Sequence, residues 1–539
     1  MTAATEPATG SVTRSSGVMA LGTIASRATG FLRVMVLAAA LGTGGARGGL
    51  ADPYNVGNVM PNIIYELLLG GILTSIVVPL LVRSAREDGD EGTAFAQSLL
   101  SMVVVVLTAL TVVSVLATPL LLRVYKAHGD PTAEEVLFTR LFLPQIVFYG
   151  VGATVGAILN TRGRFGPPMF TPVLNNLVVI GTGLLFVVVA GADRGDVERV
   201  TSGEIALLTV GTTLGVVVMT LALLPALRST GFRWRWRWDW RDPRLRAASR
   251  LGGWVLLYVA VNQVGFAVVV RLAREAEDRF TTYYYAFQLF QLPHAIVTVS
   301  VISALLPRMS RHAAAGRLGD LGAELSMGLR LSLSLVVPAV AAYLVLAKPI
   351  SVALFARGLT SEADAALLGR VLMGFTVGLV FFTAFQLQLR GFYAMHDSRT
   401  PALINVAVNA TMVAVDVVLF NVLEGDARVV GLATGYAASY AVGLAVSTVV
   451  LRRRLGGIGG RVVLTVLAKV LLAATAAAAP AYAAARVVQT SAGTKTAGSA
   501  LAALTGLAVL GAVYLVVARA LHVAEVTELT GLVGARLRR

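Results

Sequence analysis

The chain has 539 residues, of which 56% are hydrophobic and 14% are charged, and its formal net charge is +16 at pH 7. Since soluble proteins carry about 25% charged residues, this composition excludes an ordinary soluble protein and indicates a polytopic membrane protein. The absence of cysteine excludes disulfides, thiol catalysis and thiolate metal sites. No P-loop or G-x-S-x-G motif is present, so we expect no enzyme, no cofactor and no resident metal.

Fourteen segments are long and apolar enough to cross a bilayer, at about 20 residues each. They fall at 16–42, 54–83, 94–123, 135–160, 168–191, 204–227, 248–272, 280–307, 326–348, 366–390, 400–422, 429–451, 461–486 and 498–521. An even number of spans leaves both termini on one side. Arginine and lysine are concentrated in the loops that share the side of the N-terminus, so both termini are predicted to be cytoplasmic.

Three short motifs recur about 229 residues further along the chain, which indicates an internal duplication. They are Val78–Leu80 with Leu306–Arg308, Leu116–Pro119 with Leu346–Pro349, and Thr171–Asn176 with Thr400–Asn405. Each copy holds six spans, so the copies keep one orientation and are expected to be related by a pseudo-twofold axis along the membrane normal. The predicted fold is all-α, with two six-helix lobes, two further C-terminal helices and the chemistry between the lobes.

The predicted parts follow from these spans. They are a cytoplasmic N-terminal tail over 1–15, an N-terminal lobe over 16–228, a cytoplasmic basic and tryptophan-rich loop over 229–247, a C-terminal lobe over 248–454, the last two spans over 455–521 and a cytoplasmic C-terminal tail over 522–539.

Arginine and tryptophan alternate in the central loop, from Phe232 to Arg241. An extended chain places alternate side chains on opposite sides. Indoles at headgroup level and guanidiniums on lipid phosphates would suit a membrane interface. Single-stranded nucleic acid is the alternative ligand. The position between two spans favours the membrane, and no nucleic-acid partner is expected.

Two arginines, Arg27 and Arg33, lie inside the first apolar segment, six residues and about 9 Å apart along a helix. A charge at the bilayer centre costs about 2.5–3.5 kcal/mol on insertion scales. Gly30 between them permits a bend or a close helix contact. We interpret the pair as a cationic clamp for an anionic group in a water-filled cavity; the alternative is a pair of snorkelling side chains.

The second span carries a polar stripe. Asn55, Asn58 and Asn62 share one helical face, Glu66 continues it, and Asp52 lies just before it. The stripe is either a cavity wall or a set of interhelical hydrogen bonds.

In the second lobe, Gln288 and Gln291 share a face, and so do Asn405 and Asn409. Two amide oxygens from Asn405 and Asn409 would begin a cation site, although simple helix–helix hydrogen bonding also explains them. The residues up to this point predict a two-lobed transporter of an anionic or amphipathic substrate.

The pattern Ser26-Arg27-x-x-Gly30-Phe31-x-Arg33, followed by Asp52, Pro61-Asn62 and Val78-Pro79, resembles the MurJ (MviN) family of lipid II flippases. The run from Arg390 to Pro401 resembles the segment that joins spans 10 and 11 in that family. The 6+6+2 plan is shared with the wider multidrug/oligosaccharidyl-lipid/polysaccharide exporter superfamily.

The resemblance implies movement of lipid II from the inner to the outer leaflet of a bacterial cytoplasmic membrane, by alternating access, for cell wall synthesis. It implies that Arg27 and Arg33 bind the pyrophosphate of the undecaprenyl-linked headgroup. The remaining candidate substrate contacts are Asp52, Asn62, Glu66, Gln288 and Gln291. The resemblance also implies coupling to the membrane potential or to Na⁺, with Asn405 and Asn409 as candidate ligands. The expected partners are lipid II, membrane lipids and cell-wall synthesis proteins.

Three positions depart from the family pattern. Tyr65 and Gln288 stand where many members have arginine, and Gly70 stands where a glutamate is common, with Glu66 one turn earlier. A flippase for another polyprenyl-linked glycan and a non-transporting cell-wall scaffold therefore stay as alternatives. A drug/cation antiporter fits poorly, because it would need an acidic cavity.

Overall fold

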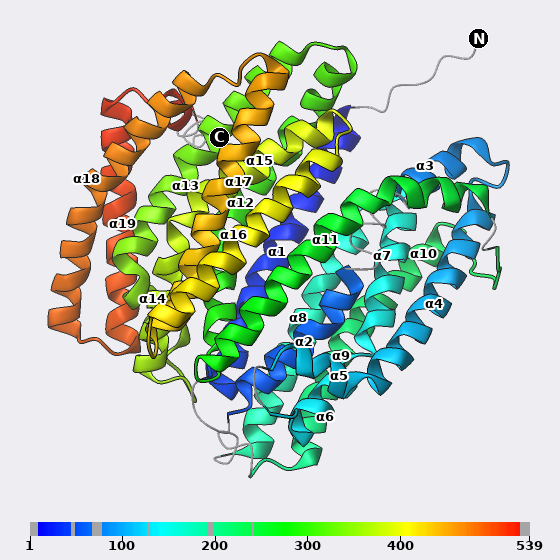
Figure 1. Cartoon of the computed structure of the whole chain (residues 1–539), viewed down its shortest axis with the longest axis horizontal. Helices are drawn as coiled ribbons and strands as arrows, with labels where there is room; N and C mark the ends of the chain where they lie inside the picture. Colours follow the sequence, from blue (N-terminus) through cyan, green and yellow to red (C-terminus); the bar gives the residue numbers. More distant parts are fainter. Residues whose placement is uncertain are drawn as a thin grey trace. The chain divides into compact units, whose positions relative to one another are not determined.

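The computed structural model describes residues 9–44, 49–66, 78–126, 129–191, 199–239 and 242–528. Within these ranges the regular elements are helices (Figure 1). The first eleven are α1 (Thr9–Leu41), α2 (Ala51–Tyr65), α3 (Val78–Glu87), α4 (Thr93–Leu116), α5 (Thr118–Val124), α6 (Ala133–Phe142), α7 (Gln145–Thr161), α8 (Gly166–Ala190), α9 (Ser202–Leu221), α10 (Leu223–Ser229) and α11 (Pro243–Glu275). The others are α12 (Phe280–Ala314), α13 (Leu318–Phe355), α14 (Glu362–Thr376), α15 (Gly378–Ala394), α16 (Arg399–Val422), α17 (Ala427–Leu455), α18 (Gly460–Ala492) and α19 (Thr496–Ala520).

Eleven of the described helices are long and apolar enough to cross a membrane, and thirteen spans result if each bent helix pair counts as one. The remaining predicted span, the second at 54–83, lies partly outside the described residues, so the predicted number is not tested. Large apolar side chains stand exposed on these helices, such as Val188 at 78% and Val422 at 71%. Such surfaces suit hydrocarbon rather than water. The all-helical membrane fold is therefore confirmed.

The chain divides into two compact units. The first comprises Met1–Gly42 and Gly48–Gln263, and the second comprises Thr43–Arg47 and Val264–Arg539. The first unit thus ends inside α11, whereas the sequence places the change of lobe in the loop at 229–247. The boundary therefore falls within one continuous helix.

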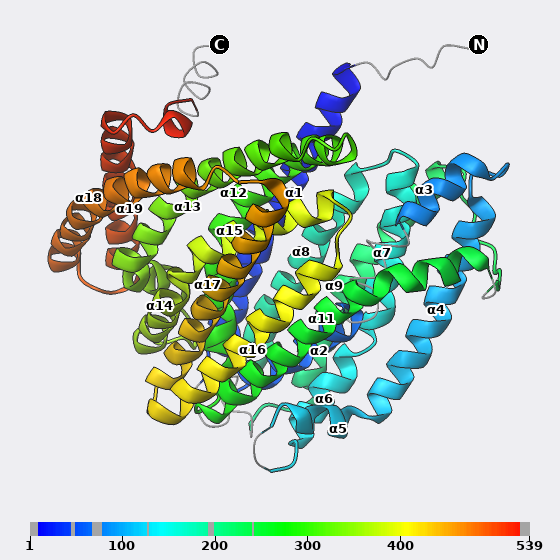
Figure 2. The ribbon, with the colours of Figure 1, turned by 45° about the horizontal axis from the view of Figure 1, so that its top comes forward.

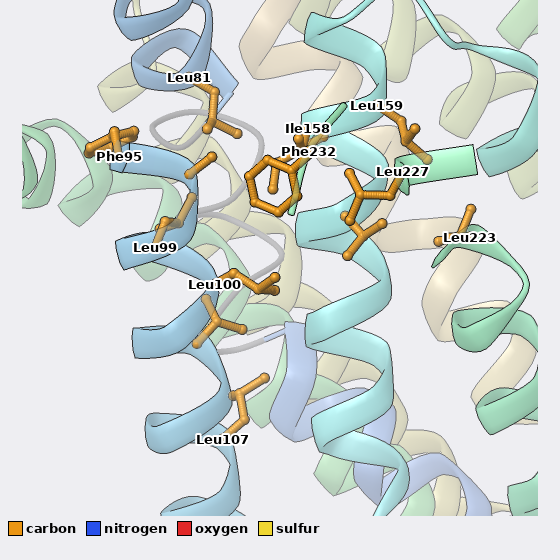
Figure 3. Packing of buried hydrophobic residues seen from close by; sticks show 14 of the residues in the cluster. Leu81, Phe95, Leu99, Leu100, Leu107, Ile158, Leu159, Leu223, Leu227 and Phe232 are labelled. Atoms are coloured by element: carbon orange, nitrogen blue, oxygen red, sulfur yellow. The ribbon is translucent and has the colours of Figure 1, made fainter. Parts of the chain in front are cut away.

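Two clusters of buried side chains hold the first unit together. One joins α4, α7 and α10 through residues such as Leu99, Ile158 and Leu227, and Phe232 inserts between them (Figure 3). The other joins α1, α2, α6, α8 and α9 around Tyr54 and Phe138. The burial of these rings and aliphatic chains fixes the position of α1 and α2, which carry four of the candidate site residues, with Glu66 directly after α2.

In the second unit, α18 and α19 lie side by side and both pack on α13 (Figure 2). The contact face of α18 is built from small residues, including Ala473, Ala477 and Ala481. Small side chains let helix backbones approach closely, which is how helices associate in a bilayer. The two helices outside the predicted repeat are therefore an integral part of this unit.

The tenth predicted span is broken near its centre, where it divides into α14 and α15 with a bend of 48° at Val377. The fourth is interrupted at Leu143–Pro144, between α6 and α7, but it passes as one span, Ala133–Thr161. The two interruptions are about 234 residues apart, close to the shift of the sequence motifs. Their corresponding positions agree with a duplication.

Candidate functional site

The two arginines of α1 differ in exposure. Arg27 is exposed and Arg33 is partly buried, on a helix that runs unbroken through both. Six residues leave their side chains about 120° apart around the axis. Among the described residues, neither guanidinium has an ion-pair or hydrogen-bond partner. Both charges are therefore available to a ligand.

Gly30 makes a close helix contact. The Asn176 amide of α8 donates from Nδ2 to the Ser26 carbonyl and to Thr29 Oγ1, both at 3.1 Å. A Cβ atom on Gly30 would lie 3.4 Å from Asn176 Nδ2. These contacts lock the rotation of α1 on α8, and Arg27 stands on the exposed side of the helix.

The polar stripe of α2 changes character along the helix. Asp52 and Asn55 are buried, and Asn55 Nδ2 donates to the Ala51 carbonyl at 3.0 Å. Asn58 accepts a long hydrogen bond of 3.5 Å from Gln145 of α7. Asn62 and Glu66, one and two turns further on, are exposed. The first half of the stripe is therefore buried within the first unit, whereas Asn62 and Glu66 at its other end are exposed.

Glu66 has an amide partner. Gln263 of α11 donates from Nε2 to Glu66 Oε2 at 3.0 Å. Beside it, the rings of Tyr65 and Tyr149 are 5.8 Å apart. No hydrogen bond or ion pair of the described residues joins Arg27 or Arg33 to these α2 residues. Gln263 is absent from the predicted site, although the two adjacent amides Asn262 and Gln263 in an apolar span were the signal that could have found it.

The glutamines of the second unit lie on α12. Gln288 and Gln291 are partly buried, and Gln288 Nε2 is 3.4 Å from the Tyr284 hydroxyl. One turn after Gln291, His294 is buried, and its Nδ1 lies 3.1 Å from Thr383 Oγ1 of α15. This face of α12 therefore presents amide groups and no fixed charge.

The candidate cation ligands lie on α16. Asn405 is fully buried and Asn409 is 7% exposed. Asn409 Nδ2 donates to the Asn405 carbonyl at 3.0 Å, and a Cβ atom on Gly265 of α11 would lie 2.2 Å from Asn409 Oδ1. Oδ1 thus faces the α11 backbone. Amide and carbonyl oxygens suit a hard cation, so the donor set fits Na⁺ in chemical type.

The run Asp397–Pro401 has a structural role. The Asp397 carboxylate accepts hydrogen bonds from the Thr400 amide (2.9 Å), the Thr400 hydroxyl (2.6 Å) and the Arg454 guanidinium of α17. Burial raises the pKa of Asp397, but the hydrogen bonds from Thr400 and the charge of Arg454 outweigh it and hold this pKa below its ordinary value. The run ties the start of α16 to the end of α17.

One ion-pair cluster was not predicted. Arg279, before α12, lies 3.3 Å from Asp364 and 3.1 Å from Asp426, and Arg370 also reaches Asp426 at 2.9 Å. The cluster joins the first turns of α12, α14 and α17. The sequence places Arg279, Asp364 and Asp426 in three separate loops and Arg370 near the end of a span, with no local spacing that signals the pairing.

Comparison with known proteins decides the family. The family model described as "Lipid II flippase MurJ" matches residues 37–501, which is most of the chain. The chain belongs to the lipid II flippase MurJ family. MurJ relatives include "Probable lipid II flippase MurJ" of Rhizobium meliloti (strain 1021), 28% identical over 400 residues and covering 72% of each chain. "Lipid II flippase MurJ" of Burkholderia cenocepacia is 25% identical over 396 residues, covering 72% of this chain and 74% of that one.

Solved structures share the MurJ fold. A structure titled "Lipid II flippase MurJ, inward closed conformation" has a TM-score of 0.71 at 18% identity and covers 93% of this chain and 99% of its own. An inward-facing multidrug transporter of the MATE family has a TM-score of 0.67 at 16% identity, covering 79% and 94%. At these identities the likeness concerns the fold, which MurJ and MATE proteins have in common.

Membership of the MurJ family confirms the resemblance and the multi-pass membrane character. Flippases are transporters, which agrees with a chain that is not a catalyst. The matched region begins at residue 37, so Arg27 and Arg33 lie just before it. Their assignment therefore depends on their own chemistry and on the motif around them.

Proposed function

We propose that this chain is a flippase that moves lipid II from the inner to the outer leaflet of the cytoplasmic membrane for cell wall synthesis. The observation that carries the proposal is the match of the MurJ family model over residues 37–501. The guanidiniums of Arg27 and Arg33, which have no ion-pair partner among the described residues, supply the chemistry that an anionic headgroup needs.

Arg27 and Arg33 are assigned to the pyrophosphate. A guanidinium binds phosphate oxygens through two parallel N–H donors, and each charge-assisted hydrogen bond contributes about 1.5–3 kcal/mol. An unpaired arginine within a span costs a similar amount. Bound pyrophosphate would offset that cost, so the two arginines favour capture of an anion.

The neutral and acidic candidates are assigned to the rest of the headgroup. Asn62, Glu66, Gln288 and Gln291 offer amide and carboxylate groups for sugar hydroxyls and peptide amides. Asp52 is buried at the start of α2 and acts as a positioning residue. Alternating access of the two lobes carries the headgroup across while the undecaprenyl tail stays in lipid. Both termini are cytoplasmic in this scheme.

An inside-negative membrane potential favours this direction. Moving one elementary charge across 100 mV changes the free energy by about 2.3 kcal/mol, so an anionic headgroup is driven outward. Asn405 and Asn409 would hold a Na⁺ ion on α16, together with backbone carbonyls. Such an ion would supply a positive charge that binds in one state of the cycle.

The test is depletion of the protein in its host, with the lipid II of each leaflet read by a periplasm-side cleavage assay. Wild type should restore outer-leaflet lipid II, while Arg27→Gln and Arg33→Gln should leave it in the inner leaflet at equal expression. Arg486→Gln is the matched control, because Arg486 is exposed on α18 and stacks on Tyr482. Full activity of both α1 variants would contradict the clamp, because transport would then not need the two guanidiniums.

A second candidate substrate is another polyprenyl-linked glycan. The observation that favours it is the pair of neutral residues, Tyr65 and Gln288, at positions where many family members have arginine. In the same depletion, an unchanged lipid II distribution with inner-leaflet accumulation of another polyprenyl-linked glycan would select this candidate. With either substrate, we also propose that the chain contacts cell-wall synthesis proteins.

A further inference from the structure

A non-helical segment follows α10 in the first unit. We call residues 232–239, with the sequence Phe-Arg-Trp-Arg-Trp-Arg-Trp-Asp, the Trp-Arg strap. Its first residue, Phe232, is 1% exposed and inserts between α4, α7 and α10 (Figure 3). The Arg162 guanidinium lies over this ring at 5.4 Å and also donates to the Thr230 carbonyl at 3.1 Å. The strap therefore starts from a fixed point.

The strap is attached to α4 at three further atoms. Gln97 Nε2 donates to the Arg233 carbonyl at 2.7 Å. Ser101 Oγ accepts from Trp234 Nε1 and from the Arg237 amide, both at 3.2 Å, and donates to the Gln97 carbonyl at 2.8 Å. A hydroxyl offers one donor and two acceptor positions, so Ser101 uses its whole capacity. The strap therefore has a defined course without regular secondary structure.

Apart from the Trp234 N–H, the strap side chains after Phe232 take no part in this attachment. Trp234, Trp236 and Trp238 are 48%, 61% and 50% exposed, and the first two rings lie 6.0 Å apart. The three arginines of the strap are exposed, and within the described residues their guanidiniums have no ion-pair partner. They outnumber the single strap carboxylate, Asp239. A fixed row of cations and indoles thus faces outward.

The level of the strap on α4 identifies what it faces. Gln97, Ser98 and Ser101 are polar, and the predominantly apolar run from Met102 to Leu116 follows directly. Ser101 lies about 12 Å from the start of the helix. The strap therefore crosses α4 where the polar end of a span meets its apolar run. That boundary is the headgroup region, where tryptophan is enriched and arginine meets lipid phosphate.

We propose that the Trp-Arg strap is a binding site for the phosphodiester headgroups of anionic phospholipids. Each guanidinium donates two N–H groups to phosphate oxygens, and each indole lies between headgroup and acyl chain. The site belongs to the first unit alone and does not rest on the transport of lipid II. It predicts a preference for phosphatidylglycerol over phosphatidylcholine.

The tryptophan distribution gives this site its own signal. The chain has five tryptophans: three in the strap, Trp240 directly after it, and Trp254 in α11. In a Trp254→Phe background the fluorescence therefore comes from the strap and its neighbour. The full-length variant is placed in phosphatidylcholine nanodiscs. One series contains increasing fractions of brominated phosphatidylglycerol, and the other contains increasing fractions of brominated phosphatidylcholine. Brominated acyl chains quench indole fluorescence on contact.

Brominated phosphatidylglycerol should quench at a lower mole fraction than brominated phosphatidylcholine. Replacing the three strap arginines by glutamine should remove this preference. At low salt, each arginine lost should lower the relative affinity for phosphatidylglycerol by roughly fivefold. The matched control removes three exposed arginines of the second unit, Arg452, Arg453 and Arg461, in the same way and should keep the preference. Ser101→Ala is the substitute test if the triple variant does not fold. It loosens the strap without changing its charge, so it should weaken the preference.

Equal quenching by the two lipids in the Trp254→Phe protein would overturn the proposal. Loss of the preference in the matched control would also overturn it, because general surface charge would then be the cause. A single-stranded oligonucleotide that shifts the fluorescence and displaces brominated phosphatidylglycerol at low concentration would overturn it in favour of nucleic acid.

Discussion

Arg27 and Asn176 are both polar groups within one helix pair, yet their surroundings differ. Asn176 is 5% exposed, and its amide donors are used by α1. Arg27 is exposed and has no partner among the described residues. A satisfied amide holds helices together, whereas an unpartnered charge favours binding of a counter-ion. Structural and ligand-binding polar residues are therefore distinguished by whether they already have hydrogen-bond or ion-pair partners in the protein, not by residue type.

The geometry of the clamp can be tested at Arg27. Arg27→Lys keeps the charge but loses the planar fork, so each bidentate contact with a phosphate becomes a point contact. We expect flipping to fall about tenfold, against a fall of about 100-fold in Arg27→Gln, which loses charge and fork together. The rate of appearance of lipid II in the outer leaflet measures both. Equal rates in the lysine variant and the wild type would show that charge alone is needed.

Asp397 gives a prediction about pH. Its pKa is held below the ordinary value of 3.8, so the folded state favours the ionised carboxylate. The resulting stability is present above about pH 4 and is lost as the pH falls through the lowered pKa. The thermal unfolding temperature of purified wild type should therefore fall on acidification below pH 4 by more than that of Asp397→Asn. A parallel fall in both proteins would exclude Asp397 as a source of this dependence.

At the scale of elements, the bend between α14 and α15 depends on a close approach to α17. A Cβ atom on Gly378 would lie 2.7 Å from the Ala437 Cα and 2.9 Å from its Cβ. These are atoms that move only with the helix itself. The bend is therefore held by backbone packing as well as by local sequence.

Gly378→Ala should lower the stability by about 1–3 kcal/mol, the usual cost of overpacking. Gly511→Ala in α19 is the matched control, because a Cβ atom there meets nothing within 4 Å. It should raise stability by up to about 1 kcal/mol through helix propensity. Denaturant unfolding of the two purified variants measures both effects. A Gly378→Ala protein as stable as the wild type would show that α17 can move away from the added methyl group without loss of stability.

At the scale of the whole molecule, the membrane topology is the open prediction. The chain contains no cysteine, so a single introduced cysteine is the only thiol target. An impermeant maleimide applied to intact cells should label cysteines at Ser202 and Thr494, and should label those at Gly89 and Ser229 only after permeabilisation. The reverse pattern would place both termini outside.

The sequence predicted the parts of this molecule that depend on local pattern. Apolar run length predicted the spans, and the motifs around Arg33 and Pro401 predicted the family. The partners of polar side chains were not predictable, because pairs such as Glu66 with Gln263 join helices nearly 200 residues apart. Burial also separated residues that share one helical face, such as Asn55 and Asn62. Spacing along a helix does not say which neighbour, if any, covers each turn.

The broken span has a consequence for how the chain enters the membrane during synthesis. α14 and α15 have 15 and 17 residues. Each half is about 23–26 Å long, less than the hydrocarbon thickness of about 30 Å. A half-helix leaving the insertion machinery alone would leave terminal backbone groups in lipid. The pair must therefore partition as one unit, sheltered by helices already made, which makes the order of synthesis part of the folding pathway.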